Sequence, residues 1–516
     1  MSGRDTSNET RVRRSVVHAA AITIALFAFV GVCLGFFYGW LDDVLFEQNF
    51  RGVFTRGRGV PETFNYLRGT GAVLTWLYAM CPGVPWYGLY QWGLLAASSV
   101  LIFHIMLSAR APRRAVVPVI LLVTSMLIEH IMLNTFTVVS MLLPGAALIV
   151  WRRRVRGRPP WVAIVLVVLL VLGYLNRPGT ALLAMGFVYA TWWVRPLSPN
   201  YDARALFRVP VLILLLVTAH MAAERVFDSP DKQRTRAEWS SIWATLDDTE
   251  PSSRMDLPDD LSQRDSTILF AVRTWYFQDT SVIGLSWFQR HAASGILDRA
   301  GPFDLASTWA NIHQKACCQY TTAGQLALNW WDELLIFFLA MACLIFAHAA
   351  RPPNARVLVL LSLGLLLTVV LLTHFLKIED RVFTPLAILA TVSFVTLSSR
   401  HSPRRIFVIG LLVLMASVNV HRILELRKLA DYKRATMVQG KALYERLVAD
   451  AGDYVILDYF SRQIIHGSPF EVYPREFLER PVIHGDPGST ELRIYREHLR
   501  SIGVPLEHER FYRWLL

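Results

Sequence analysis

Residues 16–43, VVHAAAITIALFAFVGVCLGFFYGWLDD, join a long apolar run to two adjacent carboxylates. The run from 16 to 38 contains no Asp, Glu, Lys or Arg. It is long enough to cross a hydrocarbon core of about 30 Å as a helix. It is also too long for the core of a signal peptide, and no convincing cleavage site follows it. We therefore expect a transmembrane helix that ends just before Asp42 and Asp43, at one face of the membrane.

Ten further apolar runs follow the first. They lie near residues 86–107, 115–134, 137–151, 161–175, 179–194, 207–224, 331–349, 357–376, 384–399 and 406–421. Two of them, 137–151 and 161–175, are short and could be half-helices or re-entrant segments. Only 18% of the residues are charged, whereas about a quarter is usual in soluble proteins. The sequence predicts an all-α polytopic membrane protein whose bundle of about 11 helices spans residues 16–421.

The distribution of Lys and Arg predicts the orientation of this bundle. If the N-terminal tail, residues 1–15, is cytoplasmic, the cytoplasmic connections hold 20 Arg residues. The three short exterior turns then hold only Arg177, Lys377 and Arg381. This asymmetry follows the positive-inside rule. It also accounts for the net charge of +12 without a nucleic-acid partner, and it predicts a multi-pass protein of the cell membrane.

With this orientation, three longer segments lie outside the cell membrane: residues 39–85, 225–330 and 422–516. The last opens with a charged helical stretch, continues with a strand-like run at Tyr454–Phe460, and contains a predicted helix at Ser489–Ile502. We expect it to form a small exterior α/β domain. An oxidising exterior would permit a disulfide from Cys81 to Cys317 or Cys318, although all three could equally be free thiols.

The acidic pair Asp42-Asp43 is the most informative candidate site. Carboxylates at a membrane face are costly unless they are solvated, paired or bound to a cation. The alternative is that the pair only marks the end of a helix in the headgroup region. Glu47 follows one turn later, and an amphipathic stretch at Leu67–Leu77 could lie along the interface. The segment ends in Trp86-Tyr87, which is typical of an aromatic belt where a chain re-enters the membrane.

This arrangement resembles the polytopic glycosyltransferases of the GT-C class, in which an acidic pair or DxD-like motif follows the first helix. It also resembles a set of uncharacterised bacterial membrane proteins with an Asn-Asp-Asp motif at this point. Here Leu41 occupies the first position, so the match is partial. An Arg at an exterior turn, here Arg177, and a basic, proline-ended turn, here Lys377–Pro385, are also similar to features of that class.

The resemblance implies transfer of a sugar from a polyprenyl-phosphate-linked donor to an extracytoplasmic glycan, lipid or protein acceptor at a bacterial cytoplasmic membrane. Asp42 or Asp43 would take the proton from the acceptor hydroxyl. Arg177, Lys377 and Arg381 would bind the donor phosphate, or they would merely contact lipid headgroups. No cofactor is required, but a divalent cation could bind at Asp42 and Asp43. Inversion at the anomeric carbon is implied for a single displacement.

A few other residues are candidates for cavity or acceptor contacts. They are Glu47, Glu129, His130, Trp275 and Asp279. Ionisable groups inside a membrane are functional candidates, so Glu129 and His130 could line a donor cavity or form part of a proton relay, or they could satisfy one another. Trp275 and Asp279, in the large exterior loop, could bind an acceptor sugar or could pack against the membrane.

Two other classes of function stay open. A lipid-linked oligosaccharide transporter or flippase would have a polar site at the middle of the membrane and often repeated halves. We detect no repeat, and the polar residues lie at the outer face. A non-catalytic membrane assembly component would use the exterior segments for binding, and nothing in the sequence argues against it.

Overall fold

The structure is a computed structural model, and it describes the helical part of the chain with some connections between helices. The described residues are 3–39, 41–53, 55–61, 67, 69–109, 113–152, 160–194, 205–227, 330–347, 352–375, 380–397, 404–450, 455–457, 468–471, 482–484, 497, 500, 501 and 503. Within these ranges the chain is mostly helical. Predicted features that fall elsewhere, including all of residues 228–329 and most of the Ser489–Ile502 helix, lie outside the described residues.

Each of the eleven predicted apolar runs overlaps a helix, although the first of these helices ends at Cys33, before a separate helix that carries Asp42 and Asp43. These helices are α1 (Gly3–Cys33), α4 (Trp86–Leu107), α5 (Arg113–Met132), α6 (Phe136–Arg152), α7 (Pro160–Asn176), α8 (Pro178–Val194), α9 (Ala205–Phe227), α14 (Trp330–Ala347), α15 (Pro352–Phe375), α16 (Asp380–Leu397) and α17 (Arg405–Asp450). Among the described residues, three segments are long and apolar enough to cross a membrane: Arg13–Cys33, Trp86–Leu107 and Arg405–Ala442. Shorter apolar helices of the described chain lie at Thr70–Met80, Val116–Met132, Phe136–Arg152, Trp161–Asn176, Phe207–Ala223, Ala355–Val370 and Arg381–Leu397.

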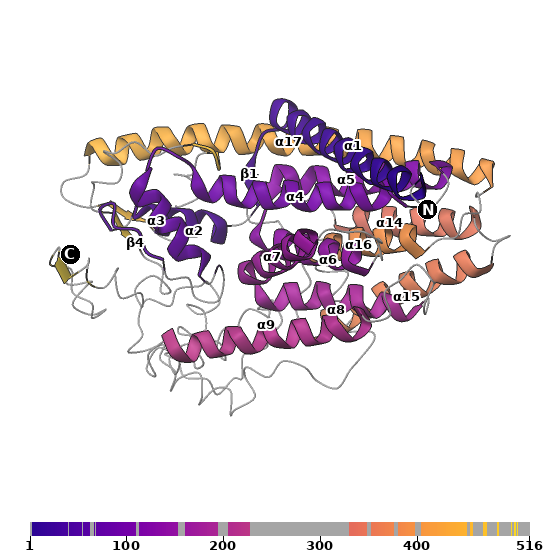
Figure 1. Cartoon of the computed structure of the whole chain (residues 1–516). Coiled ribbons are helices and arrows are strands. Elements are labelled where there is room, and N and C mark those ends of the chain that lie inside the picture. Colours follow the sequence, from indigo (N-terminus) through magenta and orange to yellow (C-terminus); the bar gives the residue numbers. More distant parts are fainter. Residues whose placement is uncertain are drawn as a thin grey trace, which may run out of the picture.

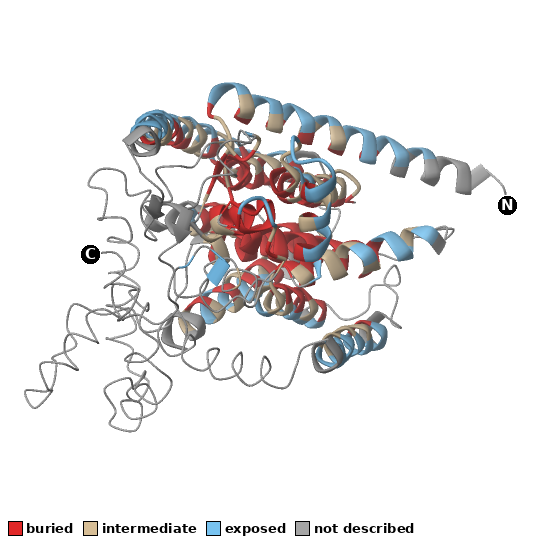
Figure 2. Ribbon diagram, turned by 90° about the vertical axis from the view of Figure 1, so that its left-hand side faces the viewer, coloured by how far each residue is buried: buried red, intermediate tan, exposed pale blue. Residues whose placement is uncertain are grey.

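Helix α6 lies at the centre of the bundle, where it packs against α4, α7, α8 and α16 (Figure 1). Almost every residue of α6 is buried, which matches its apolar character on all sides. The buried residues of the bundle gather around this centre, as Figure 2 shows. A Cβ added to Gly173 of α7 would lie 2.5 Å from Cδ of Pro144 in α6. Only glycine therefore permits this close approach of the two helices.

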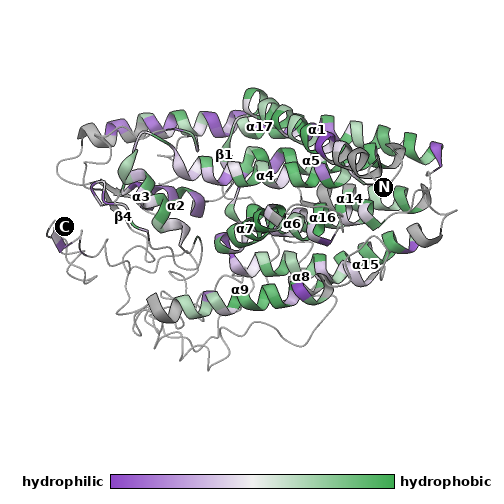
Figure 3. Ribbon diagram, viewed as in Figure 1, coloured by the Kyte–Doolittle hydropathy of each residue, from purple (hydrophilic) through white to green (hydrophobic). Residues whose placement is uncertain are grey.

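The outer surface of the bundle is also apolar. Val32 of α1, Phe207 of α9 and Ile406 of α17 are all at least three-quarters exposed, and the hydrophobic colour runs along the outer helices in Figure 3. A water-soluble protein rarely exposes a large continuous apolar surface. Backbone groups that lie in lipid must also be satisfied within their own segment, as they are in helices. The outer surface therefore supports association of the bundle with a membrane.

The described part of residues 39–85, the first of the predicted exterior segments, lies at one end of the bundle. It contains α2 (Leu41–Arg51) and α3 (Thr70–Met80), which lie together at that end in Figure 1. A short strand before α2, β1 (Phe37–Tyr38), pairs in parallel with β2 (Leu133–Asn134), which precedes α6. This pairing brings the beginning of α2 next to the beginning of α6. The amphipathic stretch was predicted at Leu67–Leu77, but the helix there begins later, after Gly69. The φ of Gly69 is 75°, a backbone conformation that glycine adopts readily.

The C-terminal part begins as a continuation of α17. The apolar run at 406–421 and the predicted charged helical stretch form one unbroken helix to Asp450, because no proline interrupts residues 405–450. The strand predicted within Tyr454–Phe460 is present as β3 (Val455–Leu457). It pairs in parallel with β4 (Val482–His484). The proposed exterior α/β domain stays a prediction beyond this pair of strands.

Candidate functional site

The two carboxylates of the acidic pair differ in exposure. Both lie in the first turn of α2, where the positive end of the helix dipole favours negative charge. Asp43 is fully buried, whereas Asp42 is half-buried. Neighbouring residues on a helix point in different directions, so the pair presents one carboxyl to the protein and one toward its surface.

Asp43 is held by neutral hydrogen-bond donors. The hydroxyl of Tyr87, in α4, donates to Oδ1 of Asp43 at 2.7 Å, and the backbone N–H of Phe136, in α6, donates to the same oxygen at 3.3 Å. The other oxygen, Oδ2, has no hydrogen bond within the described part of the chain. Burial raises the pKa of Asp43 to about 8, although the Tyr87 hydrogen bond opposes this shift. Burial therefore favours the protonated form of this carboxyl.

Two of the predicted cationic residues lie near the acidic pair. Arg177, between α7 and α8, donates to Oγ1 of Thr137 at 2.7 Å, and its guanidinium lies 5.7 Å from the centre of the Phe136 ring. Phe136 therefore contacts Arg177 through its ring and Asp43 through its backbone. The charge of Arg381, in the first turn of α16, acts to lower the pKa of Asp43. The structure thus brings Asp43, Arg177 and Arg381 to the same end of the bundle.

Glu47 lies one turn after Asp43 and is fully buried. Its Oε1 accepts a hydrogen bond from Nη2 of Arg51 at 2.6 Å, and this ion pair is shielded from water. The hydroxyl of Tyr78, in α3, lies 3.5 Å from the same oxygen. Burial raises the pKa of Glu47, and the charge of Arg51 opposes the rise. Glu47 is therefore placed to hold α2 and α3 together, and it has no exposed surface for a direct contact with an acceptor.

Glu129 and His130 belong to another part of the bundle. Glu129 of α5 forms a buried ion pair with Arg422 of α17. The next residue in the chain, His130, is also buried. The interaction joins two helices that pack along the bundle. Glu129 is thus paired with an Arg from α17, a partner that the sequence did not indicate. This pairing favours a structural role for Glu129 over contact with an acceptor.

The remaining predicted residues cannot be placed. Lys377, Trp275 and Asp279 lie outside the described residues, as do Cys317 and Cys318. Cys81 is exposed. Among the residues that the structure describes, no group of three or more His, Cys, Asp or Glu side chains could hold a metal ion. A divalent cation at Asp42 and Asp43 stays a prediction.

Three residues of the site were not identified as such from the sequence. Tyr87 belongs to the aromatic stretch interpreted as a membrane-interface belt, yet its hydroxyl points to Asp43. Phe136 follows the polar residues Asn134 and Thr135, and this break between two apolar runs was the available signal. Arg51 was visible as a charge one helical turn after Glu47, which is the spacing of a helical ion pair.

Comparisons with known proteins identify no family for this chain. No family model matches this chain, and no curated protein matches it significantly.

Proposed function

We propose that this chain is a membrane glycosyltransferase that resembles the GT-C class. It moves a sugar from a polyprenyl-phosphate-linked donor to an extracytoplasmic glycan, lipid or protein acceptor. The observation that carries the proposal is the grouping of a half-buried Asp42, a buried Asp43 and the cationic residues Arg177 and Arg381 at one end of an apolar helix bundle. Such a grouping has a carboxylate for the acceptor and positive charge for a phosphate.

The two carboxylates have different roles in this proposal. Asp42 keeps exposed surface, so it is the base that takes the proton from the acceptor hydroxyl. The acceptor oxygen then bonds to the anomeric carbon as the bond from that carbon to the phosphate oxygen breaks. Arg177 and Arg381, with Lys377, stabilise the polyprenyl phosphate that leaves. Asp43 holds the first turn of α2 against α4 and α6 through Tyr87 and Phe136.

The proposal includes the topology of the bundle. All eleven apolar helices cross the membrane, the N-terminus is cytoplasmic, and α2, α3 and the C-terminal part lie outside. The bias of Arg toward one set of connections supports this orientation. In a chain whose five native cysteines are replaced by serine, a thiol reagent that cannot cross membranes should label Arg58→Cys in intact cells. It should not label Arg404→Cys until the membrane is permeabilised.

The activity is tested with purified protein in lipid nanodiscs, polyprenyl-phosphate sugars as donors, and acceptors extracted from the envelope of a deletion strain. Asp42→Asn should lower the turnover number by about 10²–10⁴-fold, the usual contribution of a general base. Asp43→Asn, assayed below pH 8, should cost much less, because asparagine resembles the protonated carboxyl. Arg177→Gln should raise the KM for the donor. Asp431→Asn, an exposed acidic residue of α17, is the matched control and should keep full activity.

Two results would contradict the proposal. An envelope with unchanged sugar composition in the deletion strain, with redundant enzymes removed, would argue against any glycosyl transfer. Full activity of Asp42→Asn would remove Asp42 from the chemistry. A flippase would instead move the intact lipid-linked sugar across vesicles without cleaving the bond to phosphate.

A further inference from the structure

A turn from the C-terminal part of the chain docks onto the first exterior segment. This turn, residues 468–471, lies against the beginning of α4, where the ring of Phe470 packs edge-on against Phe36 and Trp92, with ring centres 5.3 and 5.5 Å apart. A Cβ added to Gly88 would lie only 2.1 Å from the carbonyl oxygen of Pro469. The backbone of the turn therefore occupies the space that any side chain at position 88 would need.

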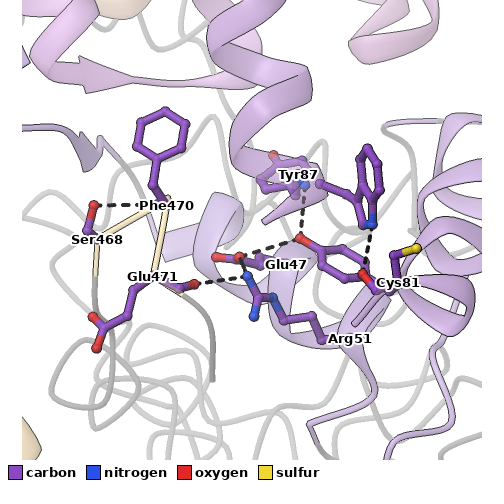
Figure 4. A network of polar contacts seen from close by, with 9 residues as sticks. Glu47, Arg51, Cys81, Tyr87, Ser468, Phe470 and Glu471 are labelled. Carbon is purple, nitrogen blue, oxygen red and sulfur yellow. Dashed lines mark hydrogen bonds and ion pairs between the residues drawn. The ribbon is translucent and has the colours of Figure 1, made fainter. Parts of the chain in front are cut away.

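Arg51 connects this turn to the helix of the acidic pair. Its Nη2 donates to the backbone carbonyl of Glu471 at 3.0 Å and also to Oε1 of Glu47 at 2.6 Å (Figure 4). The guanidinium lies over the ring of Tyr78, 4.9 Å from its centre. One buried cation thus contacts α2, α3 and the 468–471 turn. A buried guanidinium is costly unless its donors and its charge are compensated, so the turn is part of the environment that makes Arg51 stable there.

The contacts continue from Arg51 to Asp43. The hydroxyl of Tyr78 lies 3.5 Å from Glu47 and accepts the backbone N–H of Tyr87 at 2.9 Å. The hydroxyl of Tyr87 then donates to Asp43 at 2.7 Å. These links form one polar chain from the carbonyl of Glu471 to the acidic pair, and Figure 4 shows the part around Glu47, Arg51 and Tyr87.

We propose that the 468–471 turn, acting through Arg51, positions the acidic pair for the reaction; this inference rests on the function proposed above. Arg51 is a positioning residue because it touches Glu47 and the turn, and not the reacting atoms. When the turn is docked, the polar chain fixes Tyr87 on Asp43 and so fixes the first turn of α2, where Asp42 lies. When the turn is displaced, Arg51 loses a carbonyl acceptor and this chain loosens.

Two glycines of α4 give a matched pair of variants. Gly88→Ala displaces the turn, whereas a Cβ at Gly93 meets nothing within 4 Å, so Gly93→Ala makes the same change in the same helix without touching the turn. In the full chain in nanodiscs, Gly88→Ala should speed hydrogen exchange of the 468–471 and 41–51 amides. It should also lower the turnover number by about 10–100-fold, which is typical of a small displacement of catalytic groups. Gly93→Ala should change neither.

A pH measurement separates positioning from a simple loss of folded protein. Asp43 faces the Tyr87 hydroxyl, the Phe136 N–H and the charges of Asp42 and Arg381. Asp43→Asn should abolish one transition in the pH dependence of stability, so this transition reports on Asp43. If Gly88→Ala loosens the Tyr87 contact, the midpoint of this transition should shift to higher pH. A lower fraction of folded protein would change the amplitude of this transition and not its midpoint.

Phe470→Ala serves as a second, milder variant if Gly88→Ala does not fold. It removes the aromatic contacts of the turn and should give the same three changes in smaller degree. Faster exchange of the turn with unchanged turnover and an unchanged pH midpoint would overturn the inference and leave the proposed function intact. If the wild-type chain transfers no sugar, the proposed function fails; an unmoved pH midpoint would then refute the positioning of the acidic pair as well.

Discussion

Asp43 and Glu129 are both buried carboxylates, yet their partners differ in charge. Glu129 pairs with the guanidinium of Arg422 between α5 and α17. Asp43 instead accepts hydrogen bonds from a tyrosine hydroxyl and a backbone N–H, and both go to a single oxygen. A neighbouring guanidinium favours the charged form of a buried carboxylate, whereas burial with neutral donors favours the protonated form. The comparison separates a structural ion pair from a titratable site.

The largest expected effect is on the pH dependence of stability. The pKa of Asp43 rises from 3.8 to about 8 on folding, so the folded state binds more protons than the unfolded state between those values. Stability is therefore full below about pH 4 and falls as the pH rises toward 8, by on the order of 5 kcal/mol from this group. Asp43→Asn should abolish that part of the slope, as measured by thermal unfolding in detergent across pH 4–9.

One result of the unfolding measurement would contradict this prediction. If Asp43→Asn and the wild type lose stability in parallel over this pH range, Asp43 does not titrate as a buried acid, and the contrast with Glu129 disappears. Glu47 also has a pKa raised by burial, so some slope should persist in the variant. The difference between the two curves isolates Asp43.

The next largest effect is expected from Arg422→Gln. This change removes the Arg422 charge from beside the buried Glu129, and breaking a buried pair in this way costs about 3–5 kcal/mol. The double variant Glu129→Gln, Arg422→Gln should recover much of the loss, because neither charge is then left alone. Thermal unfolding of Arg422→Gln, of Glu129→Gln and of the double variant at one pH measures the coupling. A double variant as unstable as Arg422→Gln alone would show that the pair is not the source of the loss.

A smaller effect is expected from Tyr87→Phe. The variant keeps the ring but removes the O–H that donates to Asp43, which should cost about 1 kcal/mol. Because this hydrogen bond lowers the pKa of Asp43, its loss should also move the Asp43-dependent transition to higher pH. A downward shift would contradict the assigned contact.

The helices could be predicted from the sequence far better than the site. Apolar runs are local signals, and every run that was predicted overlaps a helix, even where the ends differ. The contacts of Asp43 and Arg51 are not local. Asp43 meets Phe136 93 residues later, and Arg51 meets the carbonyl of Glu471 420 residues later. No periodicity encodes such pairings, and the two-residue pairing of β1 with β2 is too short to be recognised in advance.

The difference between the two members of the acidic pair also could not be predicted. Asp42 and Asp43 are identical in sequence terms, and their exposure depends on which side of α2 faces α4 and α6. The cationic residues were easier to nominate, because the predicted orientation leaves few Lys or Arg residues in the short exterior turns. The structure places Arg177 beside Phe136 and Arg381 close enough to act on Asp43, while their exterior location stays a prediction.

The smallest effect is expected from Asp431→Asn, on the same helix as Arg422. Asp431 pairs with Arg434 at 3.1 Å, but both side chains are about half exposed. Water and salt screen such a pair, and the side chains lose entropy when they are held together, so the change should cost less than about 0.5 kcal/mol. Arg434 also keeps its hydrogen bond to the carbonyl of Leu34. Thermal unfolding at low and high salt should show little difference from the wild type, while Arg422→Gln is strongly destabilised at both. Equal losses for the two variants would mean that burial does not distinguish the ion pairs of α17, and the contrast between Glu129 and Asp43 would then lose its physical basis.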